Sequence, residues 1–181
     1  MKYLEATIGL PLILAMDKTG RIQWYIDAAF AVHNGMKSHT GAVMTMGTGA
    51  AKSQSNKQKL NTKSSTESEF VGVDDVISQV IWTRYFLEAP NETIHDNIVY
   101  QDNQSAIKLE KNGTKSSGKR TRHINIRYFF VTDRISADEL NVEYCPTLEM
   151  LGDYFTKPLQ GSLFRKFRNT ILGINEADIP A

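Results

Sequence analysis

The chain has 181 residues, of which 41% are hydrophobic and 23% charged, a composition typical of one soluble globular domain. Its 21 Lys and Arg nearly balance its 20 Asp and Glu, so the overall charge gives no sign of nucleic-acid binding and any such signal must be local. The single cysteine, Cys145, cannot form an internal disulfide, which fits a reducing compartment and a small buried side chain. The apolar run at residues 8–16 is too short to span a bilayer, and Pro11 interrupts it. We therefore expect an intracellular protein without a membrane partner.

The first half of the chain predicts antiparallel strands behind a short leader. We expect the leader over residues 1–20, with the end of a helix and a first strand at residues 10–15. Further strands are expected at residues 22–27, 43–46 and 51–58, because turn-forming residues separate these runs and Gly47-Thr48-Gly49 is typical of a hairpin.

The second half alternates between helical and strand patterns. Thr66 and Glu69 have the spacing of a helix-capping box, and apolar residues follow at helical spacing, so a long helix is expected there, with Trp82 and Tyr85 in the core. Ser162 is expected to cap the last helix and Gly173 to end it. Between the long helix and this last helix we expect strands at residues 97–101 and 140–144, and helices at residues 104–111, 123–135 and 149–155.

This order predicts an α/β protein with a mixed sheet, neither an antiparallel sandwich nor a doubly wound parallel fold. The domain should cover residues 21–174, followed by a disordered tail at residues 175–181.

Asp102 is the most informative acid in the sequence. It directly follows the expected strand at residues 97–101, and the carboxyl ends of strands are where open α/β sheets place their chemistry. A carboxylate there is costly unless a cation meets it, so a metal or a basic substrate is one interpretation. The alternative is that Asp102 caps the following helix.

Three more acids occupy comparable places. Asp27 ends an apolar strand, Glu67 lies in the first turn of the long helix, and Asp153 lies near the C-terminal end of the domain. Singly, each has a structural explanation as a turn residue, a dipole partner or a solvated helix face. Together with Asp102 they outline a carboxylate cluster suited to hard divalent cations such as Mg²⁺.

Five segments resemble, in order and spacing, the ribonuclease H region of copia-type LTR retrotransposon polyproteins, which lies C-terminal to the reverse transcriptase. The resemblance covers residues 2–174, and its motifs are DAAF (27–30), SSTESEF (64–70), QDNQSA (101–106), RHINIRY (122–128) and DYFTKPL (153–159). It implies a ribonuclease H-like fold, a mixed five-stranded sheet with three antiparallel strands followed by parallel strands, flanked by helices. It also implies an endonuclease that hydrolyses the RNA strand of RNA/DNA hybrids during reverse transcription.

In that family Asp, Glu, Asp and Asp bind two Mg²⁺ ions, for which Mn²⁺ can substitute. The matching positions here are Asp27, Glu67, Asp102 and Asp153, with Glu69 as the rival of Glu67. The family resemblance favours Glu67 and leaves Glu69 as the capping residue. Many ribonucleases H also carry a mobile histidine before the last aspartate, and residues 144–149 contain none.

A local basic cluster is the second functional signal. It consists of Lys119, Arg120, Arg122, His123 and Arg127, and we expect it to contact the phosphates of a hybrid. The alternative is a solvated loop, although basic charge at a helix N-terminus opposes the helix dipole.

Asn103 and Gln104, beside Asp102, are further expected nucleic-acid contacts. The resemblance implies the reverse-transcriptase part of the same polyprotein as a partner, and a cytoplasmic location within virus-like particles. The competing hypothesis for the whole chain is an inactive remnant, or a connection-like scaffold that keeps the fold for binding or assembly.

Overall fold

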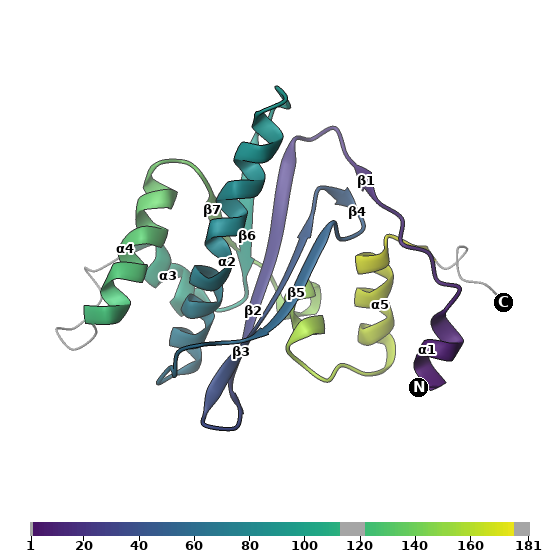
Figure 1. Cartoon of the computed structure of the whole chain (residues 1–181), viewed down its shortest axis with the longest axis horizontal. Helices are drawn as coiled ribbons and strands as arrows, with labels where there is room; N and C mark the ends of the chain where they lie inside the picture. The colour runs from purple at the N-terminus through teal and green to yellow at the C-terminus, as the bar shows by residue number, and fades with distance from the viewer. Residues whose placement is uncertain (1, 113–121, 176–181) are drawn as a thin grey trace.

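The computed structural model describes residues 2–112 and 122–175, and within these ranges it leaves out the side chains of residues 4, 6, 112 and 122–128. Its strands are β1 (Ala15–Met16), β2 (Arg21–His33), β3 (Lys37–Thr45), β4 (Gly47–Thr48), β5 (Lys52–Lys57), β6 (Asp96–Gln101) and β7 (Asn141–Tyr144). Its helices are α1 (Lys2–Thr7), α2 (Ser65–Glu88), α3 (Gln104–Asn112), α4 (Arg122–Ser136) and α5 (Gly161–Leu172), with the short 3₁₀ helices η2 (Thr147–Glu149) and η3 (Leu151–Phe155). Figure 1 shows their arrangement.

The main sheet has five strands in the order β5-β3-β2-β6-β7. β2 pairs antiparallel with β3, and β3 antiparallel with β5, whereas β2–β6 and β6–β7 are parallel. The predicted fold class is therefore confirmed: three antiparallel strands are followed by parallel ones, and helices flank the sheet. β1 and β4 form a separate two-stranded pair.

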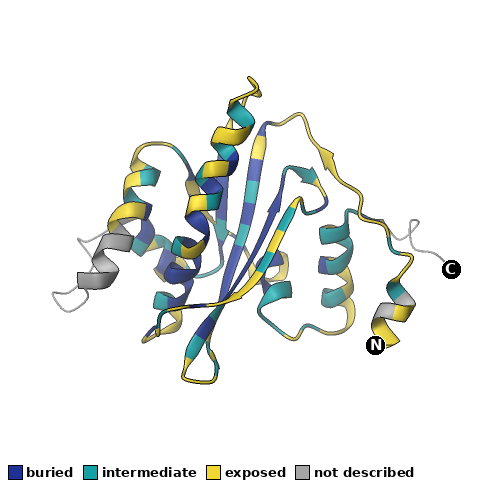
Figure 2. Ribbon diagram, viewed as in Figure 1, coloured by how far each residue is buried: buried dark blue, intermediate teal, exposed yellow. Residues whose placement is uncertain are grey.

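Two hydrophobic cores lie on opposite faces of the sheet. Ile22, Trp24 and Ile26 alternate along β2 and are fully buried with apolar residues of α2, α3 and α4. Tyr25 points to the other face, where Phe167 of α5 is completely buried. Figures 1 and 2 show the same division, with α2, α3 and α4 on one side of the sheet and α5 on the other.

The structure extends the strands predicted at residues 22–27 and 43–46 to β2 and β3, and three further predicted elements differ from it. The expected strand at residues 10–15 is reduced to Ala15–Met16, because the preceding segment runs beside α5, where the Ile13 backbone N–H donates to the Leu172 carbonyl. The expected helix at residues 149–155 is two 3₁₀ helices, because Met150 between them is extended. The last helix starts at Gly161 with Gln160 as N-cap, so Ser162 is not its cap, while Gly173 ends it with a left-handed φ of 68° as predicted.

Trp82 and Tyr85 are exposed, so their predicted place in the core is wrong. Trp82 stacks on Phe86 at the surface, and the Tyr85 hydroxyl donates to Glu139 at 2.6 Å. The helix α2 is apolar on more than one face, and periodicity alone could not identify the buried one.

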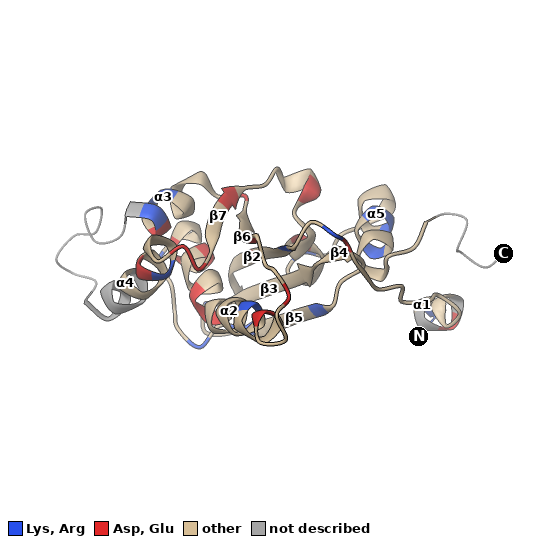
Figure 3. Cartoon of the chain, turned by 90° about the horizontal axis from the view of Figure 1, so that it is seen from above, with Lys and Arg blue, Asp and Glu red and all other residues tan. Residues whose placement is uncertain are grey.

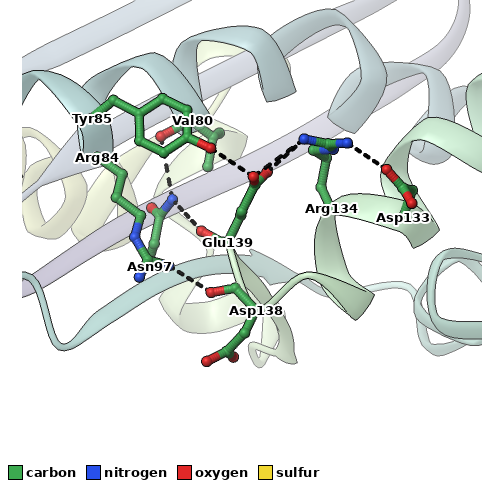
Figure 4. Close-up of polar contacts among 8 residues, drawn as sticks. All are labelled: Val80, Arg84, Tyr85, Asn97, Asp133, Arg134, Asp138 and Glu139. Atoms are coloured by element: carbon green, nitrogen blue, oxygen red, sulfur yellow. Dashed lines mark hydrogen bonds and ion pairs between the residues drawn. The ribbon is translucent and has the colours of Figure 1, made fainter.

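A set of charged and polar side chains joins the C-terminal ends of α2 and α4, and we call it the Glu139 network (Figure 4). Both oxygens of Glu139 accept hydrogen bonds from Arg134, at 3.1 and 3.2 Å, and one also accepts the Tyr85 hydroxyl. Arg134 also pairs with Asp133. Asn97 of β6 donates to the backbone carbonyl of Glu139, so the network fixes both helices to the sheet.

Candidate metal centre at the sheet edge

Asp27 and Asp102 occupy equivalent positions on neighbouring parallel strands. The β2–β6 pairing ends with Tyr25 opposite Tyr100. Asp27 lies two residues further along β2, and Asp102 lies two residues after Tyr100, immediately after the end of β6. Because side chains alternate with a period of two and paired strands lie about 5 Å apart, the two carboxylates face the same side at the same level.

Glu69 reaches this pair from the helix α2. One of its carboxylate oxygens accepts the backbone N–H of Ala28 at 3.0 Å, which holds the side chain against the middle of β2, next to Asp27. α2 packs closely on the strand at Gly72, where an added Cβ would be in van der Waals contact with the Cβ of Ala28 at 3.5 Å.

One oxygen from each of Asp27, Glu69 and Asp102 lies within 4.8 Å of the other two. Asp27 and Glu69 are buried and Asp102 is half-buried. Carboxylate oxygens at this separation are the donor set that hard cations such as Mg²⁺ and Mn²⁺ prefer, so the residues present fit a divalent ion.

Asp153 lies beside the cluster because η3 packs directly on the sheet. An added Cβ on Gly152 would be 2.9 Å from the backbone nitrogen of Asp27, and one on Gly41 would be 2.7 Å from the Gly152 carbonyl oxygen. Such contacts are closer than a side chain allows, so these two glycines permit η3 to bring the buried Asp153 next to Asp27.

Two residues after η3 contact these acids directly. The Thr156 hydroxyl donates to one oxygen of Asp27. The Lys157 ammonium lies 2.7 Å from Asp153 Oδ1 and 3.4 Å from Asp27 Oδ1. Neither residue was predicted as a site residue, although a lysine four positions after an acid is a usable signal for an ion pair.

The electrostatics of the site disfavour charge on its acids. Burial, then the charges of Asp27 and Asp102, raise the pKa of Glu69 well above its usual value. Burial also raises the pKa of Asp153 to about 6, although its hydrogen bond with Lys157 opposes the shift. Burial alone would lower the pKa of Lys157, but that hydrogen bond and the charge of Asp27 raise it.

The predicted capping box at Thr66 and Glu69 is wrong, and the roles of the two glutamates are reversed. Ser64 is the N-cap of α2, its hydroxyl accepts the Glu67 backbone N–H, and the Glu67 carboxylate accepts the Lys63 backbone N–H at 2.5 Å. Glu67 is therefore the capping residue, and Glu69 lies with Asp27 and Asp102. The position beside Asp27 and Asp102 that was predicted for Glu67 is therefore occupied by Glu69.

Asp102 is not a helix cap. Asn103 caps α3, because its side-chain oxygen accepts the backbone N–H groups of Ser105 and Ala106 at 3.0 and 3.2 Å. The Asp102 carboxylate accepts only the Thr147 hydroxyl at 3.1 Å among the hydrogen bonds of the described residues. Gln104, also an expected nucleic-acid contact, is exposed at the start of α3.

The predicted basic cluster falls outside what the structure describes. Lys119 and Arg120 precede α4 in the undescribed segment 113–121, and the side chains of Arg122, His123 and Arg127 are not described either. Their phosphate contacts remain a prediction.

The sheet order, with one acid on β2 and another directly after its parallel neighbour β6, defines a ribonuclease H fold. The N-terminal ribonuclease H domain of rv2228c from Mycobacterium tuberculosis, solved as a fusion with maltose-binding protein, superposes with a TM-score of 0.50 at 10% identity. It covers 82% of this chain and 96% of that one. At this identity the likeness shows the fold alone.

Sequence relatives identify the family within this fold class. The retrovirus-related Pol polyprotein from transposon TNT 1-94 of Nicotiana tabacum is 32% identical over 91% of this chain. The corresponding polyprotein from transposon RE2 of Arabidopsis thaliana is 30% identical over 94%. The chain spans 12% of the length of each, and no family model matches it. It is therefore a homologue of one segment of the Pol polyproteins of copia-type transposons, the family that its motifs resemble.

Proposed function

We propose that the chain is the ribonuclease H of a retrotransposon Pol polyprotein and hydrolyses the RNA strand of RNA/DNA hybrids with two Mg²⁺ ions, for which Mn²⁺ can substitute. One observation carries the proposal. On a ribonuclease H fold, oxygens of Asp27, Glu69 and Asp102 come within 4.8 Å of one another, and Asp153 lies beside them.

The chain's own residues would hold the ions and orient the substrate. Asp27, Glu69 and Asp102 supply ligand oxygens from two strands and a helix, and Asp153 supplies another through its proximity to Asp27. Divalent ions bound in such a site polarise phosphoryl oxygens and lower the pKa of water. Thr156 fixes the rotamer of Asp27 through its hydrogen bond, so that carboxylate is preorganised.

Substrate binding would depend on sequence-independent contacts. Lys119, Arg120, Arg122, His123 and Arg127 would contact phosphates, and selection of the RNA strand would rest on 2′-hydroxyl contacts. The Asn103 side-chain oxygen is committed to its cap, so the Asn103 amide nitrogen and the exposed Gln104 remain as donors. The helix α5 would add the basic residues Arg165, Lys166 and Arg168, and Figure 3 shows basic positions along that helix.

The relatives suggest the cellular context. Residues 21–174 would form the catalytic domain and residues 1–20 the leader from the reverse-transcriptase part, which would be its partner in virus-like particles inside the cell. Among the described residues, no helix combines the length and apolarity that crossing a bilayer requires.

A cleavage assay tests the proposal. The purified chain is incubated with an RNA/DNA hybrid labelled on the RNA strand, with Mg²⁺ or with a chelator, and with matched RNA and DNA duplexes as controls. We expect Mg²⁺-dependent cleavage of the RNA in the hybrid only. Binding of the hybrid without cleavage, at any Mg²⁺ or Mn²⁺ concentration, would instead support the inactive scaffold.

A further inference from the structure

The acid cluster already contains one cation, the ammonium group of Lys157. This group lies 2.7 Å from Asp153 Oδ1 and 3.4 Å from Asp27 Oδ1, so it bridges two carboxylates from opposite ends of the domain sequence. The two acids are almost completely buried, with 1% and 2% of their side chains exposed, whereas 38% of the Lys157 side chain is exposed.

Removing this ammonium would leave Asp27, Glu69, Asp102 and Asp153 close together without a counter-charge among the described contacts of the site. Buried like charges repel each other, and each is costly when it has no partner. Lys157 thus provides the positive charge that keeps the acids assembled in the protein without ions.

The same contact opposes a metal ion. Asp27 and Asp153 are two of the proposed ligands, and the oxygens that accept the ammonium group are potential ligand atoms for an ion. Two cations at the same oxygens also repel each other. A lysine has a compact charge on a flexible stem, and its exposed side gives it a way out of the site.

We propose that Lys157 is a displaceable counter-cation, which holds Asp27 and Asp153 together in the ion-free protein and competes with divalent ions for them. It is a positioning residue that sets the affinity of the site for Mg²⁺. This inference rests on the proposed function, because it takes these acids to be the metal ligands.

The test measures Mg²⁺ binding without nucleic acid, by calorimetry and by the dependence of the unfolding midpoint on Mg²⁺ concentration. Lys157→Met removes the charge but keeps much of the apolar stem. Lys157→Arg keeps a cation, and Lys18→Met is the matched control, in an exposed turn before β2.

We expect Lys157→Met to bind Mg²⁺ about five- to tenfold more tightly than the unmodified chain, as the removal of one competing cation implies. Its unfolding midpoint in chelator should be lower. Lys157→Arg and Lys18→Met should stay within about twofold of the original affinity. A purely structural lysine predicts the reverse, since loosened ligands bind an ion more weakly.

Unchanged or weaker Mg²⁺ binding by a folded Lys157→Met would overturn this inference. If that variant does not fold, Lys157→Gln, which keeps a donor without the charge, is measured in the same way. If the unmodified chain and Asp102→Asn both fail to bind Mg²⁺, the proposed function itself falls, so the two failures are distinguishable.

Discussion

Two groups of charged side chains in this molecule are built in opposite ways. In the Glu139 network, the hydrogen bonds that Arg134 donates to Asp133 and Glu139 stabilise its charged form and raise its pKa. In the acid cluster, burial destabilises the charged form, so the pKa values of Glu69 and Asp153 are raised. The first group pairs its charges and fixes two helices to the sheet, whereas the second places several carboxylates around one lysine.

The difference separates a structural group from a candidate functional one. In a paired network, attraction between opposite charges offsets the free energy of their desolvation. In a cluster of like charges, that free energy is offset only when a cation binds. Substitutions in the cluster should therefore change activity and metal response, and substitutions in the network should change stability.

The largest effect is expected for Asp102→Asn. The change keeps the shape of the side chain and removes one ligand charge, so cleavage of a hybrid should fall at least about a hundredfold, since even the partners of metal ligands are worth about 10–100-fold. Its ion-free form should be at least as stable as the original, because Asp102 contributes to the repulsion on Glu69. Single-turnover rates and unfolding in chelator check both points. Cleavage at the original rate would remove Asp102 from the site.

The next test compares two glutamates in the same turn of α2. Glu69→Gln should abolish most of the cleavage, because Glu69 lies with Asp27 and Asp102. Glu67→Gln is the matched control, since a glutamine can still accept the Lys63 backbone N–H, and its effect on stability should be below about 1 kcal/mol. An inactive Glu67→Gln beside an active Glu69→Gln would reverse the assignment.

The basic cluster should act on binding. Replacing Lys119, Arg120 and Arg122 with Ala should weaken hybrid binding and flatten the slope of log affinity against log salt by about 0.9 for each phosphate that the protein no longer neutralises. Cleavage at saturating hybrid should change little. Titrations at several salt concentrations measure the slope, and an unaltered slope would identify the cluster as a solvated loop.

The Glu139 network should show the opposite profile. Glu139→Gln removes the charge that pairs with Arg134, so the unfolding midpoint should fall by a few degrees while the cleavage rate of the folded protein stays the same. Thermal unfolding and the hybrid assay, run on one preparation, test this. Loss of cleavage in the folded variant would show that the two groups are coupled.

The smallest effect concerns pH. Asp153 has a pKa of about 6 in the folded protein against 3.8 for the ordinary group, so the folded state binds more protons between these values. Its contribution to the free energy of unfolding should therefore decrease as the pH rises from about 4 to about 6, in the absence of metal. Asp153→Asn should remove this contribution and so reduce the pH dependence of stability, leaving the part due to Glu69, and chemical denaturation at a series of pH values would detect the change.

The sequence predicted the sheet, its mixed strand directions and three of the clustered acids. It could do so because apolar periodicity is a local property, and because the motifs match those of a known family in order and spacing. It favoured Glu67 over Glu69, because Ser64 and Thr66 are both acceptable caps and only the packing of α2 on β2 decides between them. It also missed Lys157, whose contact with Asp27 spans 130 positions and depends on the close approach of η3 at Gly152.

The most direct test of the account is a crystal structure from crystals of the protein soaked in Mn²⁺, in which the anomalous signal locates the ions. We predict at least one Mn²⁺ bound by Asp27, Glu69 and Asp102, with Glu67 still bound to the backbone of Lys63. An ion coordinated by Glu67, or no ion among these acids at saturating Mn²⁺, would contradict it.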